Sequence, residues 1–226
     1  FDIFRAAGPQ YFIVLAGDHI YKMDYSNMLA DHIDKGADCT VACIEIPLEQ
    51  ASDFGIMAVD ESMAIVDFLA KPKNPPPMVG RPDRALASMG IYIFTADFLY
   101  AELERDHRDM ASSHDFGKDI IPNLVSRGLA VAHSFEESCV KTTPDAEAYW
   151  RDVGTLDAYF AANMDLISVD PLLNMYDERW PIRTYLPNFP PPKFVFAEEG
   201  FNARRGQALD SIVCQGSIIS GGTVER

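Results

Sequence analysis

The sequence predicts an α/β fold with a mostly parallel sheet, followed by the start of a parallel β-helix. The run from Tyr11 to Leu15 is short and apolar, and Asp18 follows shortly after it. A short apolar run of this kind is typical of a strand buried on both faces. A helical pattern and a second apolar run, Cys39 to Ile46, complete a strand–helix–strand unit. Near the other end, Ile212, Ile218 and Val224 fall six residues apart with glycines between them, which is the spacing of a parallel β-helix.

The first half of the chain alternates helix and strand signals. Asp24 is a good N-cap for a helix through Lys35, which Gly36 ends. Residues 54–60 and 64–69 form two strands around a polar turn. The proline-rich run 71–77 is a loop, because proline donates no hydrogen bond to a strand neighbour. A further buried strand is expected over 88–94.

The second half begins with helices over 96–104 and 118–127 and a strand over 129–135. A helix over 155–167 is expected to turn its apolar stripe inward. Prolines then cluster and helical periodicity disappears, which indicates a linker. The predicted domains are therefore 1–169, a proline-rich linker over 170–208, and the β-helix start over 209–226.

Composition narrows the function classes. The 226 residues are 48% hydrophobic and 23% charged, as in an ordinary globular protein. No run is long and apolar enough to cross a bilayer, so no membrane partner is expected. A net charge of −15 argues against binding nucleic acid, whose phosphates need a basic surface. The four cysteines show no metal-site spacing, which favours reduced thiols and a cytoplasmic location.

Two acidic residues are candidate metal ligands. Asp18 follows a buried strand at the edge where ligands collect in parallel sheets, although it would also serve as a simple loop cap. Asp152 lies between Trp150 and a Gly-Thr helix start, where a capping role is the plain alternative. Two such carboxylates across a sheet edge would complete a Mg²⁺ site, since Mg²⁺ is commonly held by one or two carboxylates and substrate phosphates.

Two further residues are candidates for substrate contact. Lys71 follows a strand and enters the proline-rich loop, where its ammonium can bind a phosphate or simply be solvated. Ser88 begins a strand of apolar neighbours, so its hydroxyl needs a partner in the protein or in a ligand.

Six segments in order carry a family resemblance. They are Leu15 to Tyr25, Phe54 to Met57, Lys71-Pro72, Leu86 to Tyr92, His114 to Asp119 and Tyr149 to Leu156. Together they resemble the bacterial form of the glucose-1-phosphate adenylyltransferase (ADP-glucose pyrophosphorylase) family. Met175 to Asp177 and Trp180 to Tyr185 extend the resemblance into the linker.

The resemblance implies a Rossmann-like nucleotidyltransferase domain and a left-handed β-helix. It implies that ATP and α-D-glucose 1-phosphate give ADP-glucose and pyrophosphate for glycogen synthesis, in a homotetramer under allosteric control. Carried over by position, Asp18 and Asp152 would bind Mg²⁺ and Lys71 would hold the sugar phosphate. Gly55 and Ser88 would line the glucosyl pocket. Because the sugar phosphate is itself an anionic nucleophile, positioning and charge neutralisation suffice for catalysis.

Two departures limit this expectation. The family has Glu where this chain has Ala70, and a lost hydrogen bond to a charged group costs about 1.5–3 kcal/mol, or roughly one to two decades in sugar affinity. The family's glycine-rich triphosphate loop precedes the position of Phe1. The chain is therefore expected to be an interior piece with most of the β-helix missing, and poorly active by itself.

Two other functions stay open from the sequence. One is a related sugar-nucleotide transferase with another base or sugar. The other is a non-catalytic paralogue or subunit, which Ala70 favours. The presence of Asp18, Lys71 and Asp152 argues against the second alternative, because a decayed site has no need of them.

Overall fold

The computed structural model describes residues 2–200 and 202–226, which form two compact units. The first unit runs to Gly17 and from Met23 to Cys139, and the second comprises Asp18–Lys22 and Val140–Arg226. Phe1, where the first predicted domain starts, and Phe201 in the predicted linker lie outside the described residues. The domain boundaries at 169 and 208 stay predictions.

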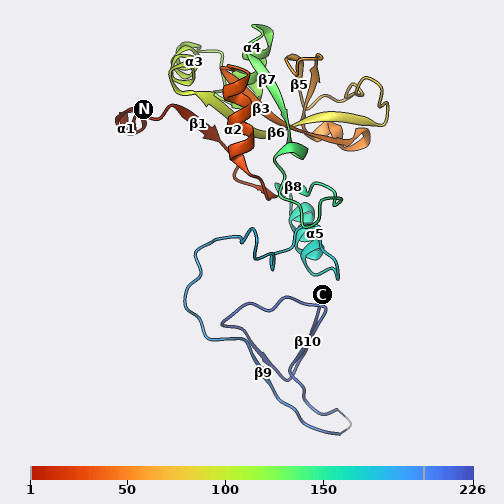
Figure 1. Ribbon diagram of the computed structural model, residues 1–226. Helices are drawn as coiled ribbons and strands as arrows, with labels where there is room; N and C mark the ends of the chain where they lie inside the picture. Colours follow the sequence, from red (N-terminus) through yellow and green to blue (C-terminus); the bar gives the residue numbers. More distant parts are fainter. Residues whose placement is uncertain (1, 201) are drawn as a thin grey trace. The chain divides into compact units, whose positions relative to one another are not determined.

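The first unit is built on a six-stranded sheet (Figure 1). Its strand order is β5-β4-β6-β3-β7, with β1 also paired to β6. The strands are β1 (Tyr11–Val14), β3 (Cys39–Pro47), β4 (Gly55–Val59), β5 (Ile65–Ala70), β6 (Arg84–Thr95) and β7 (Ala130–Ser134).

The sheet is mixed, and this confirms the predicted α/β class. Strands β1, β3, β4 and β7 run in one direction, while β5 and β6 run against them. Neighbouring strands are nevertheless mostly antiparallel: among the described strands of this sheet, only β3 and β7 pair in parallel. The reason is that β6 lies between β1 and β3 in the reverse direction, and a local alternation pattern does not encode direction.

Helices accompany the sheet, and all of them except the first were predicted (Figure 1). They are α1 (Asp2–Ala7), α2 (Tyr25–Asp34), α3 (Ala96–Arg108) and α4 (Ile121–Ser126), with short helical turns at Leu48–Asp53, Phe116–Ile120 and Phe135–Glu137. The Asp24 side chain accepts a hydrogen bond from the Ser26 amide, so the predicted cap of α2 is confirmed. Leu99 of α3 and Leu124 of α4 join buried sheet residues such as Phe94 in one apolar core.

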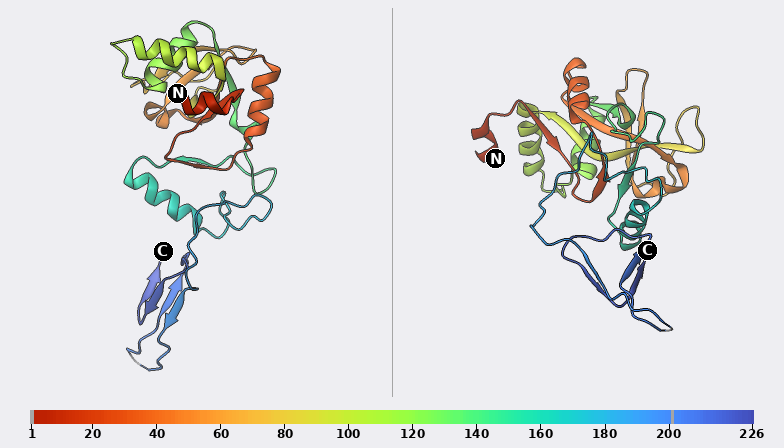
Figure 2. Two further views of the ribbon diagram at one scale, coloured as in Figure 1. Left: turned by 90° about the vertical axis from the view of Figure 1, so that its left-hand side faces the viewer. Right: turned by 60° about the horizontal axis from the view of Figure 1, so that its bottom comes forward.

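The second unit contains β2 (His19–Tyr21), β8 (Trp150–Asp152), α5 (Leu156–Leu166), β9 (Lys193–Val195), β10 (Gln207–Leu209), β11 (Ile218–Ser220) and β12 (Thr223–Glu225). Strands β9 and β11 pair in parallel, as do β10 and β12 (Figure 2). Pairs of three-residue parallel strands are what the six-residue spacing predicts. The first of them, β9, lies inside the segment 170–208 that the sequence predicts as a linker.

The prediction that α5 turns its apolar stripe inward is wrong. Leu156, Tyr159 and Phe160 are 87%, 57% and 63% exposed, while Ala162 is buried. Thr155 caps the helix by accepting a hydrogen bond from the Ala158 amide, so its predicted start is confirmed. The large apolar side chains of the first half of α5 are thus exposed, while Met164 and Leu166 in its second half are partly buried.

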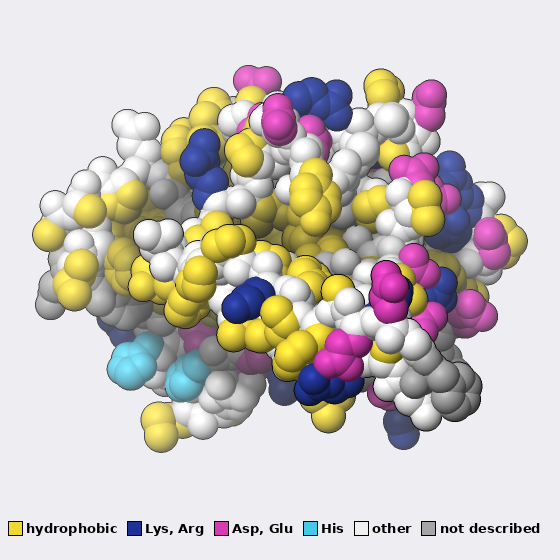
Figure 3. Space-filling model, turned by 90° about the horizontal axis from the view of Figure 1, so that it is seen from below, with side chains coloured by type: hydrophobic (Ala, Val, Ile, Leu, Met, Phe, Trp, Pro, Cys, Tyr) yellow, Lys and Arg dark blue, Asp and Glu magenta, His cyan; other side chains and the backbone are white. Residues whose placement is uncertain are grey.

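Apolar side chains also remain accessible on the β9–β12 coil. Ile212, Ile218 and Val224 are 37%, 68% and 45% exposed. In the view from below, exposed hydrophobic side chains are visible among charged ones (Figure 3). None of the described helices has the length and apolar character required to span a bilayer.

Candidate metal and sugar-phosphate sites

A two-stranded antiparallel sheet in the second unit brings Asp18 and Asp152 together. Strand β2 pairs with β8 so that His19 lies directly opposite Asp152. Beyond the end of the pair, the Val153 amide donates a hydrogen bond to the Asp18 carbonyl oxygen over 2.9 Å. Directly opposite residues present their side chains on the same face of a sheet. The pairing puts His19 and Asp152 on one face, and Asp18, the residue before β2, lies close to both. The two acids therefore meet as predicted, but at the end of a two-stranded antiparallel sheet and not at the edge of a parallel one.

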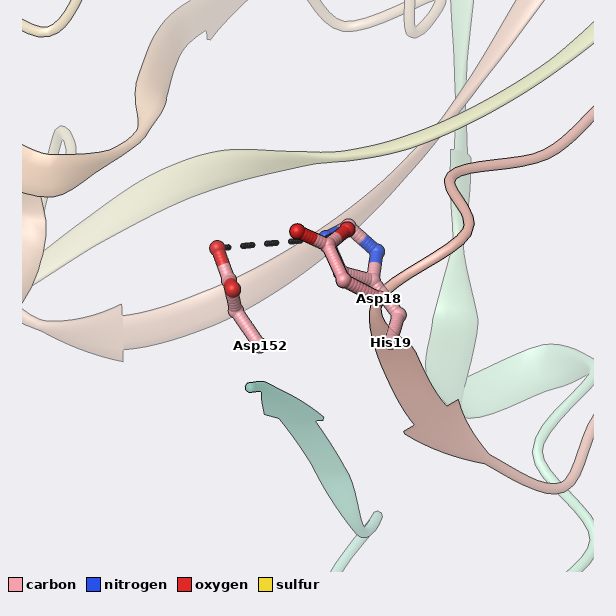
Figure 4. Close-up of side chains that lie close together, drawn as sticks. All are labelled: Asp18, His19 and Asp152. Atoms are coloured by element: carbon pink, nitrogen blue, oxygen red, sulfur yellow. Dashed lines mark ion pairs between the residues drawn. The ribbon is translucent and has the colours of Figure 1, made fainter. Parts of the chain in front are cut away.

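The two carboxylates converge with the imidazole of His19 (Figure 4). His19 Nε2 lies 3.7 Å from Asp18 Oδ1 and 3.9 Å from Asp152 Oδ2. One ligand atom from each residue lies within 4.8 Å of the other two. The Asp18 and Asp152 side chains are 59% and 36% exposed, so an ion and its substrate can approach from solvent.

Gly154 allows this close approach. An added Cβ there would lie 3.1 Å from Asp152 Oδ1 and 3.2 Å from Asp18 Oδ2, which is tighter than ordinary contact. The Gly154 amide also donates a hydrogen bond to Asp152 Oδ1 over 2.8 Å. That bond fixes the carboxylate and leaves Oδ2 turned towards His19. Sequence reasoning noted Gly154 only as part of a helix start, because its contact with Asp18 is not local.

The donor set fits a divalent cation. In an octahedral Mg²⁺ site with bonds of about 2.1 Å, adjacent ligand atoms lie about 3 Å apart and opposite ones about 4 Å. The distances of 3.7 and 3.9 Å from His19 Nε2 lie between these two values, so small side-chain movements would bring the atoms to ligand spacing. Two clustered carboxylates supply the hard oxygen ligands that Mg²⁺ prefers. Asp18 and Asp152 are thus the residues of this cluster that can hold Mg²⁺.

The predicted sugar-phosphate residues lie in the first unit and share one row of its sheet. Gly55 on β4 pairs with Ala70 on β5, and Lys71 follows directly. The β4–β6 pairing of Ile56 with Ala87, continued by one residue, places Gly55 opposite Ser88. Gly55, Ser88 and the residue before Lys71 are thus neighbours on three adjacent strands.

The local structure explains the glycine among these residues and describes the setting of the other two. A Cβ at Gly55 would lie 2.6 Å from Cζ of Phe68, so this position has no room for a side chain. Lys71 has a φ of 46°, a left-handed conformation that is uncommon outside glycine and that marks the loop start. Ser88 is 9% exposed, and its hydroxyl accepts a long hydrogen bond, 3.4 Å, from the Gly90 amide.

Comparison with known proteins identifies the family. The family model described as "Nucleotidyl transferase" matches residues 2–169, and one described as "GlmU-like, C-terminal hexapeptide" matches residues 190–226. The chain belongs to the nucleotidyl transferase family. The hexapeptide match confirms the predicted start of a left-handed β-helix after the transferase domain.

A curated relative is similar over the whole of this nucleotidyl transferase chain. The glucose-1-phosphate adenylyltransferase of Albidiferax ferrireducens is 56% identical over 225 residues, which is 100% of the chain and 52% of the relative. The chain therefore spans about half the length of that protein.

An ion-pair network that the sequence did not reveal ties β2 to the chain after α5. Lys22 is 6% exposed and donates a hydrogen bond to the Asn174 carbonyl oxygen over 2.9 Å. Its Nζ lies 3.8 Å from Asp177 Oδ2, and Arg179 Nε donates to Asp177 Oδ1 over 3.1 Å. The hydrogen bonds from Arg179 are the main reason that the pKa of Asp177 is lowered. Met175 to Asp177 carried part of the family resemblance, but sequence alone did not reveal the contact of Asp177 with Lys22.

Proposed function

We propose that the protein transfers the adenylyl group of ATP to α-D-glucose 1-phosphate, giving ADP-glucose and pyrophosphate for glycogen synthesis. The observation that carries the proposal is the 56% identity, over the whole chain, with a glucose-1-phosphate adenylyltransferase. The converging carboxylates Asp18 and Asp152 support it, because adenylyl transfer needs a cation at the phosphates.

The reaction requires little covalent chemistry from the protein. A phosphate oxygen of glucose 1-phosphate bonds to the α-phosphorus of ATP. The bond from that phosphorus to the bridging oxygen breaks, and pyrophosphate leaves with the electron pair. Catalysis is then positioning and charge neutralisation.

The proposed roles follow from this chemistry. Asp18 and Asp152 hold Mg²⁺, which neutralises phosphate charge when bound. Lys71 binds the phosphate of glucose 1-phosphate, a task that suits a compact ammonium at a loop start. Gly55 and Ser88 line the glucosyl pocket, which their shared row in the sheet supports.

The deciding experiment measures pyrophosphate release from ATP and glucose 1-phosphate by the natural protein with Mg²⁺. In Asp152→Asn, kcat is expected to fall by roughly 10²–10³-fold, as for loss of other groups that stabilise transition-state charge. Asp157→Asn is the matched control, because Asp157 is an exposed acid nearby in the same unit. Absence of turnover in the unaltered protein contradicts the proposal.

Ala70 supports one second candidate, a non-catalytic subunit of such an enzyme. It is an exposed alanine beside Gly55, where the family has a sugar-contacting Glu. If the protein is an enzyme with a weakened sugar site, Ala70→Glu lowers the KM for glucose 1-phosphate by roughly one to two decades. If Asp152→Asn and Ala70→Glu both leave the rate and KM unchanged, the subunit alternative is favoured. A different preferred nucleotide or sugar in the same assay would identify the related-transferase alternative.

The proposal extends to a homotetramer under allosteric control in the cytoplasm. The exposed apolar residues Leu156, Tyr159 and Phe160 on α5 are consistent with subunit contacts, since large apolar patches mark interaction sites. The free thiols of Cys39 and Cys43, both buried, are consistent with a reducing compartment. Light scattering of the natural protein tests the assembly, and a mass of one or two chains contradicts the tetramer.

A further inference from the structure

The His19 side chain lies beside the carboxylates of Asp18 and Asp152, but its burial and orientation differ from theirs. Its side chain is 10% exposed, although both neighbouring carboxylates are far more open to solvent. The ring packs edge-on against Trp150, with centroids 5.1 Å apart and planes at 83°. This packing fixes the direction in which the imidazole points, and Nε2 faces Asp18 and Asp152 (Figure 4).

Hydrogen bonding within the protein does not account for this orientation. The distances of 3.7 and 3.9 Å from Nε2 to the two carboxylate oxygens are too long for hydrogen bonds. On the other side of the ring, Nδ1 is buried and has no hydrogen-bond partner among the described residues. Neither ring nitrogen is therefore hydrogen-bonded within the described residues, and Nε2, which faces the two carboxylates, is the one available to a ligand.

The spacing is right for an ion shared by all three side chains. Adjacent ligands of an octahedral cation lie about 3 Å apart, so a bound ion would need to draw Nε2 and the two carboxylate oxygens together by less than about 1 Å from 3.7 and 3.9 Å. We propose that His19 binds the divalent cation through Nε2 as a third protein ligand, beside Asp18 and Asp152. This inference rests on the carboxylate metal site of the proposed function and adds a nitrogen to it.

A nitrogen ligand changes which metals the site prefers. Mg²⁺ favours oxygen ligands, whereas imidazole suits transition metals, and affinity rises along the first row through Co²⁺. The site is therefore expected to bind Co²⁺ more tightly than Mg²⁺ and to lose that preference without His19. Loss of a mere outer-shell partner costs roughly 10–100-fold in metal affinity, so loss of this ligand should weaken Co²⁺ binding at least about tenfold.

The test measures Co²⁺ and Mg²⁺ affinities of the full chain by calorimetry and records proton NMR spectra of the Co²⁺-loaded protein. A ligating imidazole gives a hyperfine-shifted ring proton signal. His19→Ala and His19→Asn should both lose that signal and at least tenfold in Co²⁺ affinity. His19→Asn keeps an oxygen donor and a similar volume, so it decides the matter if the alanine variant misfolds.

His107→Ala is the matched control. His107 is exposed and lies beside His114, with ring centroids 6.2 Å apart, so this pair is the competing place for Co²⁺. The shifted signal and the affinity should survive that substitution. If both persist in His19→Asn, the ligand assignment is wrong.

The Asp152→Asn variant distinguishes a failure of the His19 ligand from a failure of the whole carboxylate site. If it abolishes Mg²⁺ binding while His19→Asn leaves the Co²⁺ affinity and spectrum unchanged, the carboxylate site stands and only the His19 ligand fails. If Asp152→Asn leaves Mg²⁺ binding unchanged, the carboxylate site of the proposed function fails as well.

Discussion

Replacing Gly154 by Ala should loosen the proposed metal site without disturbing the backbone. Gly154 does not have a left-handed φ, so the backbone tolerates alanine and the effect comes from the added Cβ. That atom would lie 3.1 Å from Asp152 Oδ1 and 3.2 Å from Asp18 Oδ2, where ordinary contact begins at 3.4 Å. Each carboxylate oxygen must therefore retreat by about 0.2–0.3 Å, which is comparable with the roughly 0.2 Å tolerance of metal–ligand distances.

The expected result is about a tenfold loss of Mg²⁺ affinity, equivalent to about 1.4 kcal/mol. Isothermal titration of Mg²⁺ into the chain measures it directly, and circular dichroism checks that the variant is folded. Gly222→Ala is the control, because a Cβ at Gly222 has no atom within 4 Å and the residue lies in the same unit. An affinity for Gly154→Ala within twofold of the unaltered chain would refute the reasoning, since the carboxylates would then have no need of the glycine.

Three further changes test the packing and electrostatics of the two units. Gly55→Ala should destabilise the first unit by about 1–3 kcal/mol in urea unfolding, because its Cβ would lie 2.6 Å from Phe68 Cζ and overpack the site. Burial lowers the pKa of His32 in the folded chain below its ordinary 6.5. As pH falls, His32 therefore takes up its proton in the unfolded chain before it does so in the folded one. Stability from this group is therefore complete above pH 6.5 and is lost as pH falls through the lowered pKa, a dependence that thermal melts of His32→Gln should lack. Lys22→Met should cost about 2–3 kcal/mol, less than a fully broken buried pair because Asp177 keeps a second partner, and should speed hydrogen exchange around residues 174–180.

For each of these three substitutions, one experimental result would contradict the predicted effect. Unchanged unfolding of Gly55→Ala would mean that the Phe68 ring moves aside at no cost. If the melting temperature of His32→Gln falls with pH below 6.5 as steeply as that of the unaltered chain, another group causes the dependence. If hydrogen exchange in Lys22→Met accelerates equally throughout the chain, Lys22 contributes to overall stability and does not hold residues 174–180 locally.

Much of the local structure was predictable, because short-range patterns decide it. Asp24 and Thr155 were recognised as helix caps from their residue type and from the apolar spacing behind them, and both accept the capping hydrogen bond. The hairpin of β4 and β5 followed from two apolar runs around a polar turn. Helix α3 is longer than predicted, since its last turn carries charged residues that hide the periodicity.

Predictions that depended on distant partners were less complete. The exposed face of α5 was wrongly predicted as buried, because apolar spacing marks a stripe but not what covers it. The reverse direction of β6 was missed for a similar reason, since alternation along a strand is the same in both directions. The Lys22–Asp177 contact joins segments far apart in the sequence, and no pattern within either segment indicates the other.

The sequence by itself indicated the family, most of the strands and helices of the first unit, and Asp18 and Asp152 as candidate metal ligands, because motifs and periodicities are properties of contiguous residues. Only the tertiary structure decided that Asp18 belongs with the unit of Asp152, that Gly154 makes room for both, and that His19 points between them. The physical reason is that the register of β2 on β8, set by hydrogen bonds between distant segments, fixes which side chains meet.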